Sequence, residues 1–272
     1  MSKSKSAAKA PPAARTGPAK VIACCIHKGG TGKTTIAVHL AHFLASRQKR
    51  VLMVDCDTQG NATQIFIDDD SGLAGSSQLF TSKGSKAVVH QAEGSNVLVM
   101  PADEDLTEID SLRDGEEYLF RDNLRAVAAQ HQVDYVVIDT PPTLNMGMLA
   151  PLVASDFAFS PFKPDPFCFR GISSLTKRIE QIRVQHNPDL AFLGLLINLW
   201  NRRNSDHNAI VEALKESQSE HIIPYMIGDR AAIARVAFSR TPVWSHHTGA
   251  AGVAAKEMRA ALSWIVDQME AA

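Results

Sequence analysis

His27-Lys28-Gly29-Gly30-Thr31-Gly32-Lys33-Thr34-Thr35 lies between an apolar run at residues 21–26 and a helical stretch at residues 33–46. Three glycines allow the backbone to wrap around an anion with its N–H groups pointing inward. A helix that begins at Lys33 adds its positive end, Lys33 supplies a charge to the β- and γ-phosphates, and the Thr34 hydroxyl is a potential Mg²⁺ ligand. The alternative is a glycine-rich turn that happens to precede a helix. Gly-Lys-Thr-Thr in register after an apolar strand favours a phosphate-binding loop instead.

Outward from this loop, short apolar runs alternate with helical stretches. The runs are 21–26, 51–54, 97–100, 135–138, 157–159 and 192–199, and a helical stretch at 106–131 contains a break near Gly115. Continuous apolar runs are typical of strands buried on both faces, and their alternation with helices indicates parallel pairing. The sequence therefore predicts an α/β fold, with a mostly parallel twisted sheet flanked by helices on both faces. Ligands of such sheets bind at the carboxyl ends of the strands.

Composition predicts one domain preceded by an arm. The chain has 272 residues, of which 45% are hydrophobic and 21% charged, and this length can bury a core without disulfides. Residues 1–19 are mostly Ala, Pro, Lys and Ser, which predicts a disordered basic arm ahead of one folded domain at 20–272. The four cysteines show no metal-ligand spacing, so we expect core residues in a reducing compartment. The sequence shows neither a secretory signal nor a membrane-spanning apolar run, which predicts a cytoplasmic protein.

Charge is distributed unevenly along the chain. Residues 1–20 contain five bases and no acid, although the net charge of the whole chain is −1. The segment 55–122 contains fifteen acids and four bases, whereas 163–240 contains eleven bases and eight acids. A polyanion would therefore meet the arm or the C-terminal half of the chain. The arm itself is either a nucleic-acid contact or a solubilising tail.

The phosphate loop departs from the standard pattern G-x-x-x-x-G-K-[ST], because position 27 is histidine and a second lysine, Lys28, begins the loop. This arrangement resembles the deviant Walker A motif of the ParA/MinD family of P-loop ATPases. Asp55-Cys56-Asp57-Thr58-Gln59-Gly60-Asn61-Ala62-Thr63 is similar to the family motif D-x-D-P-Q-G-N-A-T, and Ile138-Asp139-Thr140-Pro141-Pro142 is similar to its Walker B segment. The resemblance covers about residues 20–266 and is strongest to the short ParA partition ATPases. The chain departs at Thr58, which replaces a proline, and in the interior of 223–242.

The resemblance implies roles for individual residues. Asp57 matches the water-orienting residue, and Lys28 matches the lysine that reaches the nucleotide of a second protomer. Asp139 matches the acid that holds Mg²⁺ through water, while Asp55 either supports the Mg²⁺ shell or caps the following helix. The predicted ATP contacts are Lys28, Gly29, Gly30, Thr31, Gly32, Lys33, Thr34 and Thr35, with Asn198 and Pro224 near adenine. Thr34, Asp139 and Asp55 form the predicted Mg²⁺ site, and Lys28, Lys33 and Asp57 the catalytic set.

The resemblance also implies a function. An ATP-bound homodimer binds DNA non-specifically, positions a plasmid, a chromosome or a protein assembly over the nucleoid, and is released when a ParB-like or cargo-adaptor protein stimulates hydrolysis. Phosphate contacts by basic side chains carry no sequence information and weaken with salt. Arg202 and Arg203 are the first candidates for these contacts. The others are Arg170, Lys177, Arg178, Arg230, Arg235 and Arg240.

Three other interpretations remain. A MinD-like membrane ATPase needs a basic amphipathic C-terminal helix. Here Met258, Leu262, Ile265 and Met269 form an apolar stripe, which we expect to be core packing because Asp267 and Glu270 would meet anionic lipid. A metal-handling relative needs bridging cysteines, but Cys24 and Cys25 are adjacent on a strand and point to opposite faces. An amidoligase or small-molecule kinase would need an acceptor pocket that the sequence does not locate.

Overall fold

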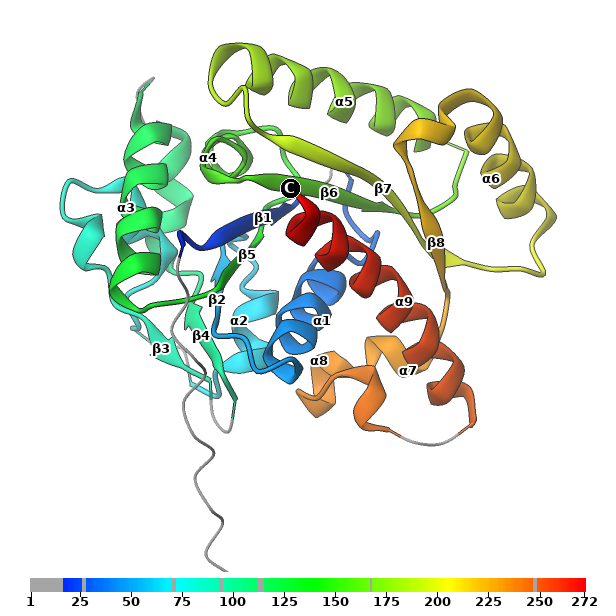
Figure 1. The fold of residues 1–272 in the computed structure, drawn as a ribbon, viewed down its shortest axis with the longest axis horizontal. Coiled ribbons are helices and arrows are strands. Elements are labelled where there is room, and N and C mark those ends of the chain that lie inside the picture. The colour runs from blue at the N-terminus through cyan, green and yellow to red at the C-terminus, as the bar shows by residue number, and fades with distance from the viewer. Residues whose placement is uncertain are drawn as a thin grey trace, which may run out of the picture.

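The computed structural model describes residues 17–25, 28–69, 72–92, 95–111, 115–166, 168–246 and 249–272. Within this part of the chain, the strands form one sheet of order β3-β4-β2-β5-β1-β6-β7-β8 (Figure 1). They are β1 (Lys20–Cys24), β2 (Val51–Asp55), β3 (His90–Gln91), β4 (Val97–Met100), β5 (Tyr135–Asp139), β6 (Phe157–Phe162), β7 (Ala191–Trp200) and β8 (Ile222–Gly228). Neighbouring strands pair in parallel except β3, which is antiparallel to β4. The predicted α/β fold is confirmed.

Helices cover both faces of this sheet (Figure 1). They are α1 (Lys33–Ser46), α2 (Asn61–Phe66), α3 (Glu116–Gln130), α4 (Met146–Ala154), α5 (Cys168–Gln185), α6 (Ser205–Gln218), α7 (Ala231–Ala234), α8 (Val236–Ser239) and α9 (Gly249–Ala271). Short 3-10 helices occupy Ser76–Phe80, Gly84–Lys86, Glu104–Ser111, Ser219–His221 and Val243–Ser245. The predicted break in the helical stretch 106–131 is present, because a 3-10 helix ends at Ser111 and α3 follows Gly115.

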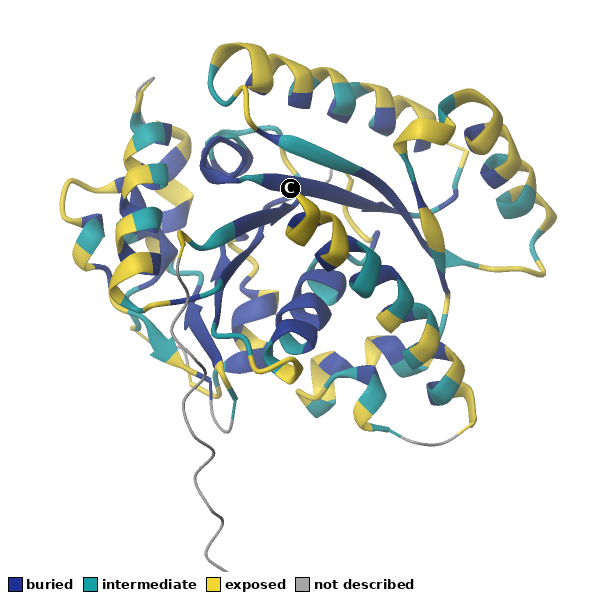
Figure 2. Cartoon of the chain, in the orientation of Figure 1, coloured by how far each residue is buried: buried dark blue, intermediate teal, exposed yellow. Residues whose placement is uncertain are grey.

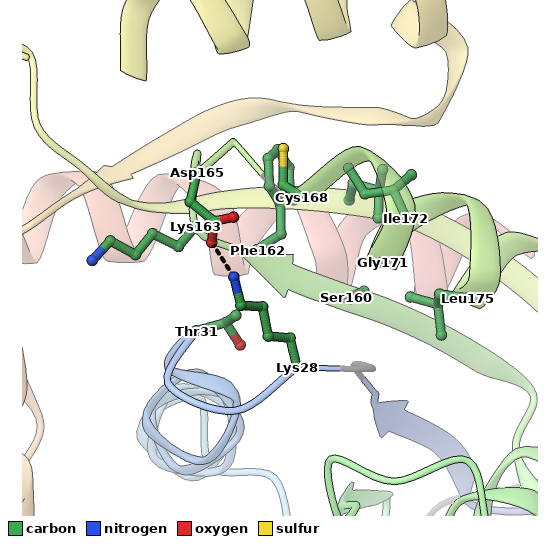
Figure 3. A pocket seen from close by; sticks show the side chains of 11 residues that line it. Lys28, Thr31, Ser160, Phe162, Lys163, Asp165, Cys168, Gly171, Ile172 and Leu175 are labelled. Carbon is green, nitrogen blue, oxygen red and sulfur yellow. Dashed lines mark hydrogen bonds and ion pairs between the residues drawn. The ribbon is translucent and has the colours of Figure 1, made fainter. Parts of the chain in front are cut away.

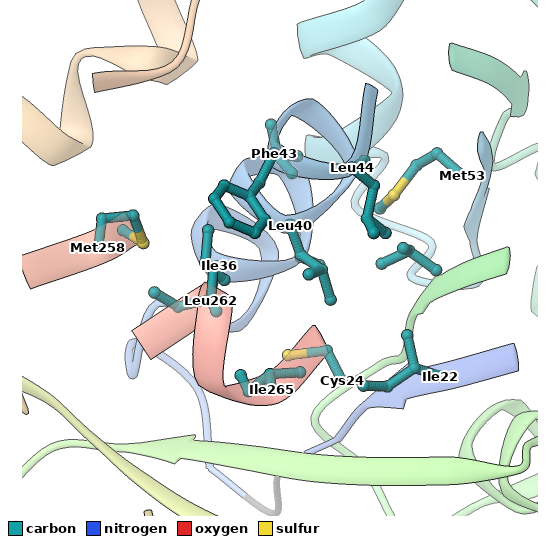
Figure 4. Close-up of a cluster of buried hydrophobic side chains, with 14 of the residues drawn as sticks. Ile22, Cys24, Ile36, Leu40, Phe43, Leu44, Met53, Met258, Leu262 and Ile265 are labelled. Carbon is teal, nitrogen blue, oxygen red and sulfur yellow. The ribbon is translucent and has the colours of Figure 1, made fainter. Parts of the chain in front are cut away.

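The core lies on the two faces of the sheet, and its central strands, β4, β2, β5, β1 and β6, are almost wholly buried (Figure 2). On one face, β1 packs through Ile22 and Cys24 against α1 and α9 (Figure 4). On the other, Ala23 and Cys25 pack against residues of α4 and α5. Cys24 and Cys25 therefore do point to opposite faces, and burial raises the pKa of Cys25 to about 12. A thiol in that state stays protonated and unreactive at neutral pH.

The C-terminal helix α9 buries the apolar stripe that the sequence contains. Met258, Leu262, Ile265 and Met269 are all fully buried, in the same cluster as residues of α1. The prediction of core packing is confirmed. Among the described residues, no helix is both long and apolar enough to cross a membrane.

The two-residue strand β3 was not predicted, and two strands that contain proline also differ from the prediction. The run at 157–159 continues to Phe162 as β6, and Pro161 pairs with Leu196 of β7 although proline is rare inside a central strand. The second is β8, an edge strand that contains Pro224, and no strand was predicted there. Proline interrupts the apolar pattern of both strands, so β6 was predicted to end too early and β8 was not predicted.

Candidate functional site

The phosphate loop lies between β1 and α1, as the sequence predicts. Gly30 and Gly32 have φ angles of 76° and 84°, a conformation that favours glycine, and Gly32 precedes the first residue of α1. A Cβ atom at Gly32 would lie 2.4 Å from the side-chain nitrogen of Asn198. Among the described residues, nothing lies within 4 Å of a Cβ atom added at Gly29 or Gly30. The loop is thus supported from β7 at Gly32 and open at its first turn.

Lys33 lies among aspartate carboxylates at the carboxyl ends of β2 and β5. Its Nζ donates to Asp139 Oδ1 at 2.5 Å and lies 3.6 Å from Asp57 Oδ2. Parallel pairing explains why these side chains lie together. Asp55 and Asp139 end neighbouring strands in register, and Asp57 follows Asp55 by two residues. The structure therefore brings together Lys33, Asp57 and Asp139, which were predicted as site residues from three separate motifs.

Burial and pairing shift the ionisation of this cluster. Burial raises the pKa of Asp139 above its ordinary value, against the opposing effect of Lys33. For Lys33, burial alone would lower the pKa, but Asp139 outweighs it and the net pKa is raised. Burial and the nearby Asp139 raise the pKa of Asp55 to about 7. The ammonium of Lys33 is thus held charged in a site where other groups resist ionisation.

The residues present fit a bound Mg²⁺ ion and a phosphate. Asp139 Oδ2 is buried and has no hydrogen-bond partner among the described residues. The Thr34 side chain, at the start of α1, is close enough to Asp139 to lower the pKa of that carboxyl. A free carboxylate oxygen beside a hydroxyl is the kind of oxygen donor set that Mg²⁺ accepts, with water completing the shell.

Asp55 serves as a brace in this structure. Its Oδ2 accepts hydrogen bonds from the backbone N–H and the hydroxyl of Thr63, each at 2.8 Å, and its Oδ1 accepts from the Asp57 N–H at 3.1 Å. Thr63 lies in the first turn of α2, so Asp55 caps that helix from the neighbouring strand end. Of the two alternatives for Asp55, the geometry here is the capping one, and both oxygens are engaged by the chain itself.

Lys28 is the second lysine of the loop, and it contacts its own chain. Its Nζ lies 2.6 Å from Asp165 Oδ2, in the loop between β6 and α5 (Figure 3). The side chain of Lys28 is 47% exposed, against 6% for Lys33. Asp165 was not identified from the sequence. The strand was predicted to end at Phe159, whereas β6 ends at Phe162, so the prediction did not place Asp165 just after the end of a strand, as it placed Asp57.

The two residues predicted near adenine lie in different surroundings. Asn198 is buried, and its Nδ2 donates to the Thr31 carbonyl at 2.7 Å, so it supports the phosphate loop from β7. Pro224 is exposed in the middle of the edge strand β8, four residues before the strand ends at Gly228. Its contact with adenine stays a prediction.

The predicted DNA contacts are spread over both sides of the sheet. Arg202 and Arg203 are exposed in the turn between β7 and α6, while Arg170, Lys177 and Arg178 lie on α5. Arg230, Arg235 and Arg240 flank α7 and α8, whose buried residues Ile233 and Val236 pack on the opposite face from α5. Arg230 is paired with Glu257 and Arg240 with Asp68.

His39 is a buried polar residue that the sequence analysis missed. Its Nδ1 lies 2.7 Å from the Thr35 carbonyl, and its Nε2 accepts from the Val243 N–H at 3.1 Å. His39 is fully buried, and burial lowers its pKa to about 4. The ring therefore ties the first turn of α1 to a segment 204 residues away. Its position on an otherwise apolar helix face is a weak signal, since such a histidine is more often simply packed.

Fold and site together define a P-loop nucleotide-binding protein. A family model described as an AAA domain matches residues 19–192. The chain is 33% identical over 257 residues to protein IncC of Escherichia coli, an alignment that covers 93% of this chain and 70% of IncC. It is 34% identical over 214 residues to the chromosome partitioning protein ParA of Myxococcus xanthus, covering 75% of each. The chain belongs to the ParA/MinD family of P-loop ATPases.

Solved structures share the fold. An ATP complex of a McdA variant from Cyanothece superposes with a TM-score of 0.80 at 18% identity, covering 92% of this chain and 96% of McdA. Cobyrinic acid a,c-diamide synthase from Mycobacterium smegmatis, solved with ADP and magnesium, gives a TM-score of 0.72 at 24% identity, covering 80% of this chain and 90% of the synthase. One of these neighbours is named for amide synthesis and the other is not, so the fold alone does not select the function.

Proposed function

We propose that this chain is a Mg²⁺-dependent ParA-type ATPase that dimerises on ATP, binds DNA non-specifically in that state and releases it after hydrolysis. The observation that carries the proposal is the meeting of Lys33, Asp57 and Asp139 at 2.5 and 3.6 Å beneath a glycine loop. Its relatives by sequence include proteins named for chromosome partitioning. Its task would be to position or segregate a plasmid, a chromosome or a protein assembly over the nucleoid.

In this proposal, ATP phosphates lie in the loop Lys28–Thr35 and draw the Lys33 ammonium away from Asp139. Asp139 and the Thr34 hydroxyl would then be the residues that hold Mg²⁺. Mg²⁺ supplies charge neutralisation at the β- and γ-phosphates. Asp57, which lies within reach of the same ammonium, orients the attacking water. Lys28 contacts the nucleotide of the second protomer.

Hydrolysis is coupled to DNA through the exposed cations. Arg202 and Arg203 follow β7, the strand that supports the phosphate loop through Asn198. Dimerisation doubles the number of cations that one DNA molecule meets, so affinity rises steeply without any sequence-reading motif. A ParB-like or cargo-adaptor protein then stimulates hydrolysis and releases the dimer.

The N-terminal arm, residues 1–19, is part of the proposal as a further DNA contact beside the ATPase domain at 20–272. Residues 1–16 lie outside the described residues. Ala19 packs against the core, and its carbonyl accepts a hydrogen bond from Arg125 at 2.8 Å. The described chain is therefore anchored from Ala19 onward.

A titration with plain duplex DNA of arbitrary sequence tests the proposal. Binding is compared without nucleotide, with ADP and with ATP, each with Mg²⁺, at two salt concentrations. We expect retention with ATP alone, falling steeply with salt. DNA binding that is the same in all three states, or absent from all three, would contradict the proposal.

The MinD-like membrane function is less favoured by the structure. Its helix would have to present the stripe of Met258, Leu262, Ile265 and Met269 to lipid. All four side chains are buried against α1 and the sheet. Exposing them would open the main core, so membrane binding through α9 would cost the fold much of its stability.

A further inference from the structure

We infer that the Lys28–Asp165 ion pair is a latch, which holds Lys28 against its own chain and so sets how readily the protein dimerises on ATP. The inference rests on the proposed function, because it assumes that Lys28 contacts the nucleotide of a second protomer. It adds a regulatory contact, formed by Asp165, within the same site.

The pair joins two loops that are far apart in the sequence. Lys28 begins the phosphate loop, and Asp165 lies 137 residues later between β6 and α5, with 2.6 Å between Nζ and Oδ2. Figure 3 shows the pair lying across a cavity that both residues line together with Thr31 and Ser160. An ammonium held in this way is directed at a carboxylate of its own protomer, and reaching another molecule requires the pair to separate.

The backbone of the phosphate loop next to Lys28 is free to rotate. Gly29 and Gly30 directly follow Lys28, and a Cβ atom added at either would meet no atom of the described part of the chain within 4 Å. Gly30 already has a φ angle of 76°. Within the described residues, the buried hydroxyls of Thr31 and Ser160 have no hydrogen-bond partner in the cavity below. Lys28 can therefore rotate away from Asp165 without displacing packed side chains beside the glycines.

Exposure to water distinguishes the Lys28–Asp165 pair from the buried Lys33–Asp139 pair, and it is the exposed pair that can act as a latch. Lys28 is 47% exposed and Asp165 21%, so water competes with the pair and it contributes little to stability. Lys33 and Asp139 are 6% and 0% exposed, so their separation requires a strong ligand such as phosphate. Measured pairs of the exposed kind bias an equilibrium by about 1.5- to 5-fold. A dimer opens two latches, so the expected bias on dimerisation is about 2- to 30-fold.

The test is the dimerisation constant of Asp165→Asn, measured by sedimentation with a saturating non-hydrolysable ATP analogue and Mg²⁺. We expect the variant to dimerise about 2- to 30-fold more tightly than the wild type. The difference should shrink as salt rises, because salt screens the exposed pair that only the wild type has. A general loosening of the loop would not show this salt dependence.

Two control variants accompany the measurement. Asp165→Glu keeps the carboxylate and should dimerise like the wild type. Glu212→Gln removes the partner of Lys215, a lysine on α6 that is 46% exposed, against 47% for Lys28, and whose ion pair spans 3.1 Å; this variant should also leave dimerisation unchanged. Thermal unfolding of each variant verifies that the fold is intact.

The outcomes separate the latch from the proposed function. If the wild type dimerises and Asp165→Asn dimerises equally or more weakly, the latch is wrong and the proposed function stands. If the wild type stays monomeric at saturating nucleotide, the ATP-driven dimer is wrong and the latch falls with it. A tighter Asp165→Asn dimer whose advantage survives high salt would also overturn an electrostatic latch.

Discussion

Charged side chains are buried at the centre of the sheet and exposed on its flank. At the ends of β2 and β5, Lys33, Asp57 and Asp139 are nearly excluded from water, and Lys33 pairs with both carboxylates. On the flank, which comprises the surface helices α5 and α6 on one face of the sheet and α7 and α8 on the other, cations such as Arg203 and Arg235 are exposed, and the pair Arg240–Asp68 is open to solvent. Charges interact strongly where water is excluded and weakly where it is present. The effects of substitution should therefore fall from the centre outward.

The largest effect is expected for Lys33→Ala. Removing the ammonium takes away the phosphate contact and leaves Asp139 buried without its partner. We expect ATP affinity to fall by at least about 1000-fold, which amounts to loss of binding in a titration with a fluorescent ATP analogue. The exposed Lys215→Ala on α6 serves as the control. Unchanged nucleotide affinity in Lys33→Ala would refute the phosphate-loop assignment.

Asp57→Ala should separate binding from turnover. Asp57 is 3.6 Å from Lys33 Nζ but does not form the closest contact, which belongs to Asp139. Losing a group that orients the attacking water should reduce kcat by about 100-fold or more while leaving ATP-driven dimerisation in place. Single-turnover phosphate release and sedimentation with ATP measure the two properties on one sample. Normal turnover would show that Asp57 has another role.

The sequence was most informative about this central region. Continuous apolar runs predicted β1, β2, β4, β5 and most of β7, and the carboxyl-end rule placed Asp57 and Asp139 at one edge. Those inferences succeed because a buried parallel strand and a glycine loop each have a local pattern. The brace from Asp55 to Thr63 was visible only as one of two alternatives, since it depends on where α2 lies after the turn.

His39 is a buried titratable group outside the nucleotide site, and its burial should make the free energy of unfolding depend on pH. Its pKa of about 4 lies below the usual 6.5, so the folded state binds fewer protons than the unfolded state between these values. This contribution to stability is present above pH 6.5 and is lost as the pH falls toward 4. Relative to His39→Gln, the wild type should lose up to about 3 kcal/mol of unfolding free energy over that range. Urea unfolding at several pH values measures it, and parallel curves for the two proteins would contradict the assignment.

The flank was harder to predict because its features depend on tertiary contacts. A count of basic residues grouped Arg170, Arg230 and Arg240 with the others, but spacing along the chain does not reveal that Glu257 pairs with Arg230 or Asp68 with Arg240. Pro224 resembled a family position, yet it occupies an edge strand whose pattern a proline interrupts. Pairing across 137 residues, as between Lys28 and Asp165, leaves no local signal.

The smallest effect is expected for the exposed turn after β7. Replacing Arg202 and Arg203 together by glutamate removes four cations from the dimer. The change should weaken ATP-dependent DNA binding by at least about 10-fold at low salt and reduce the magnitude of the slope of log K against log salt by about 4. Hydrolysis without DNA should be unchanged, because neither side chain contacts the Lys33 cluster. Arg240→Gln is the matched comparison: its guanidinium is offset by Asp68, so its removal should change the salt slope by less than about one. Equal slopes for the wild type and the Arg202/Arg203 variant would move the DNA contacts to α5, where Arg170 and Lys177 are the next exposed cations.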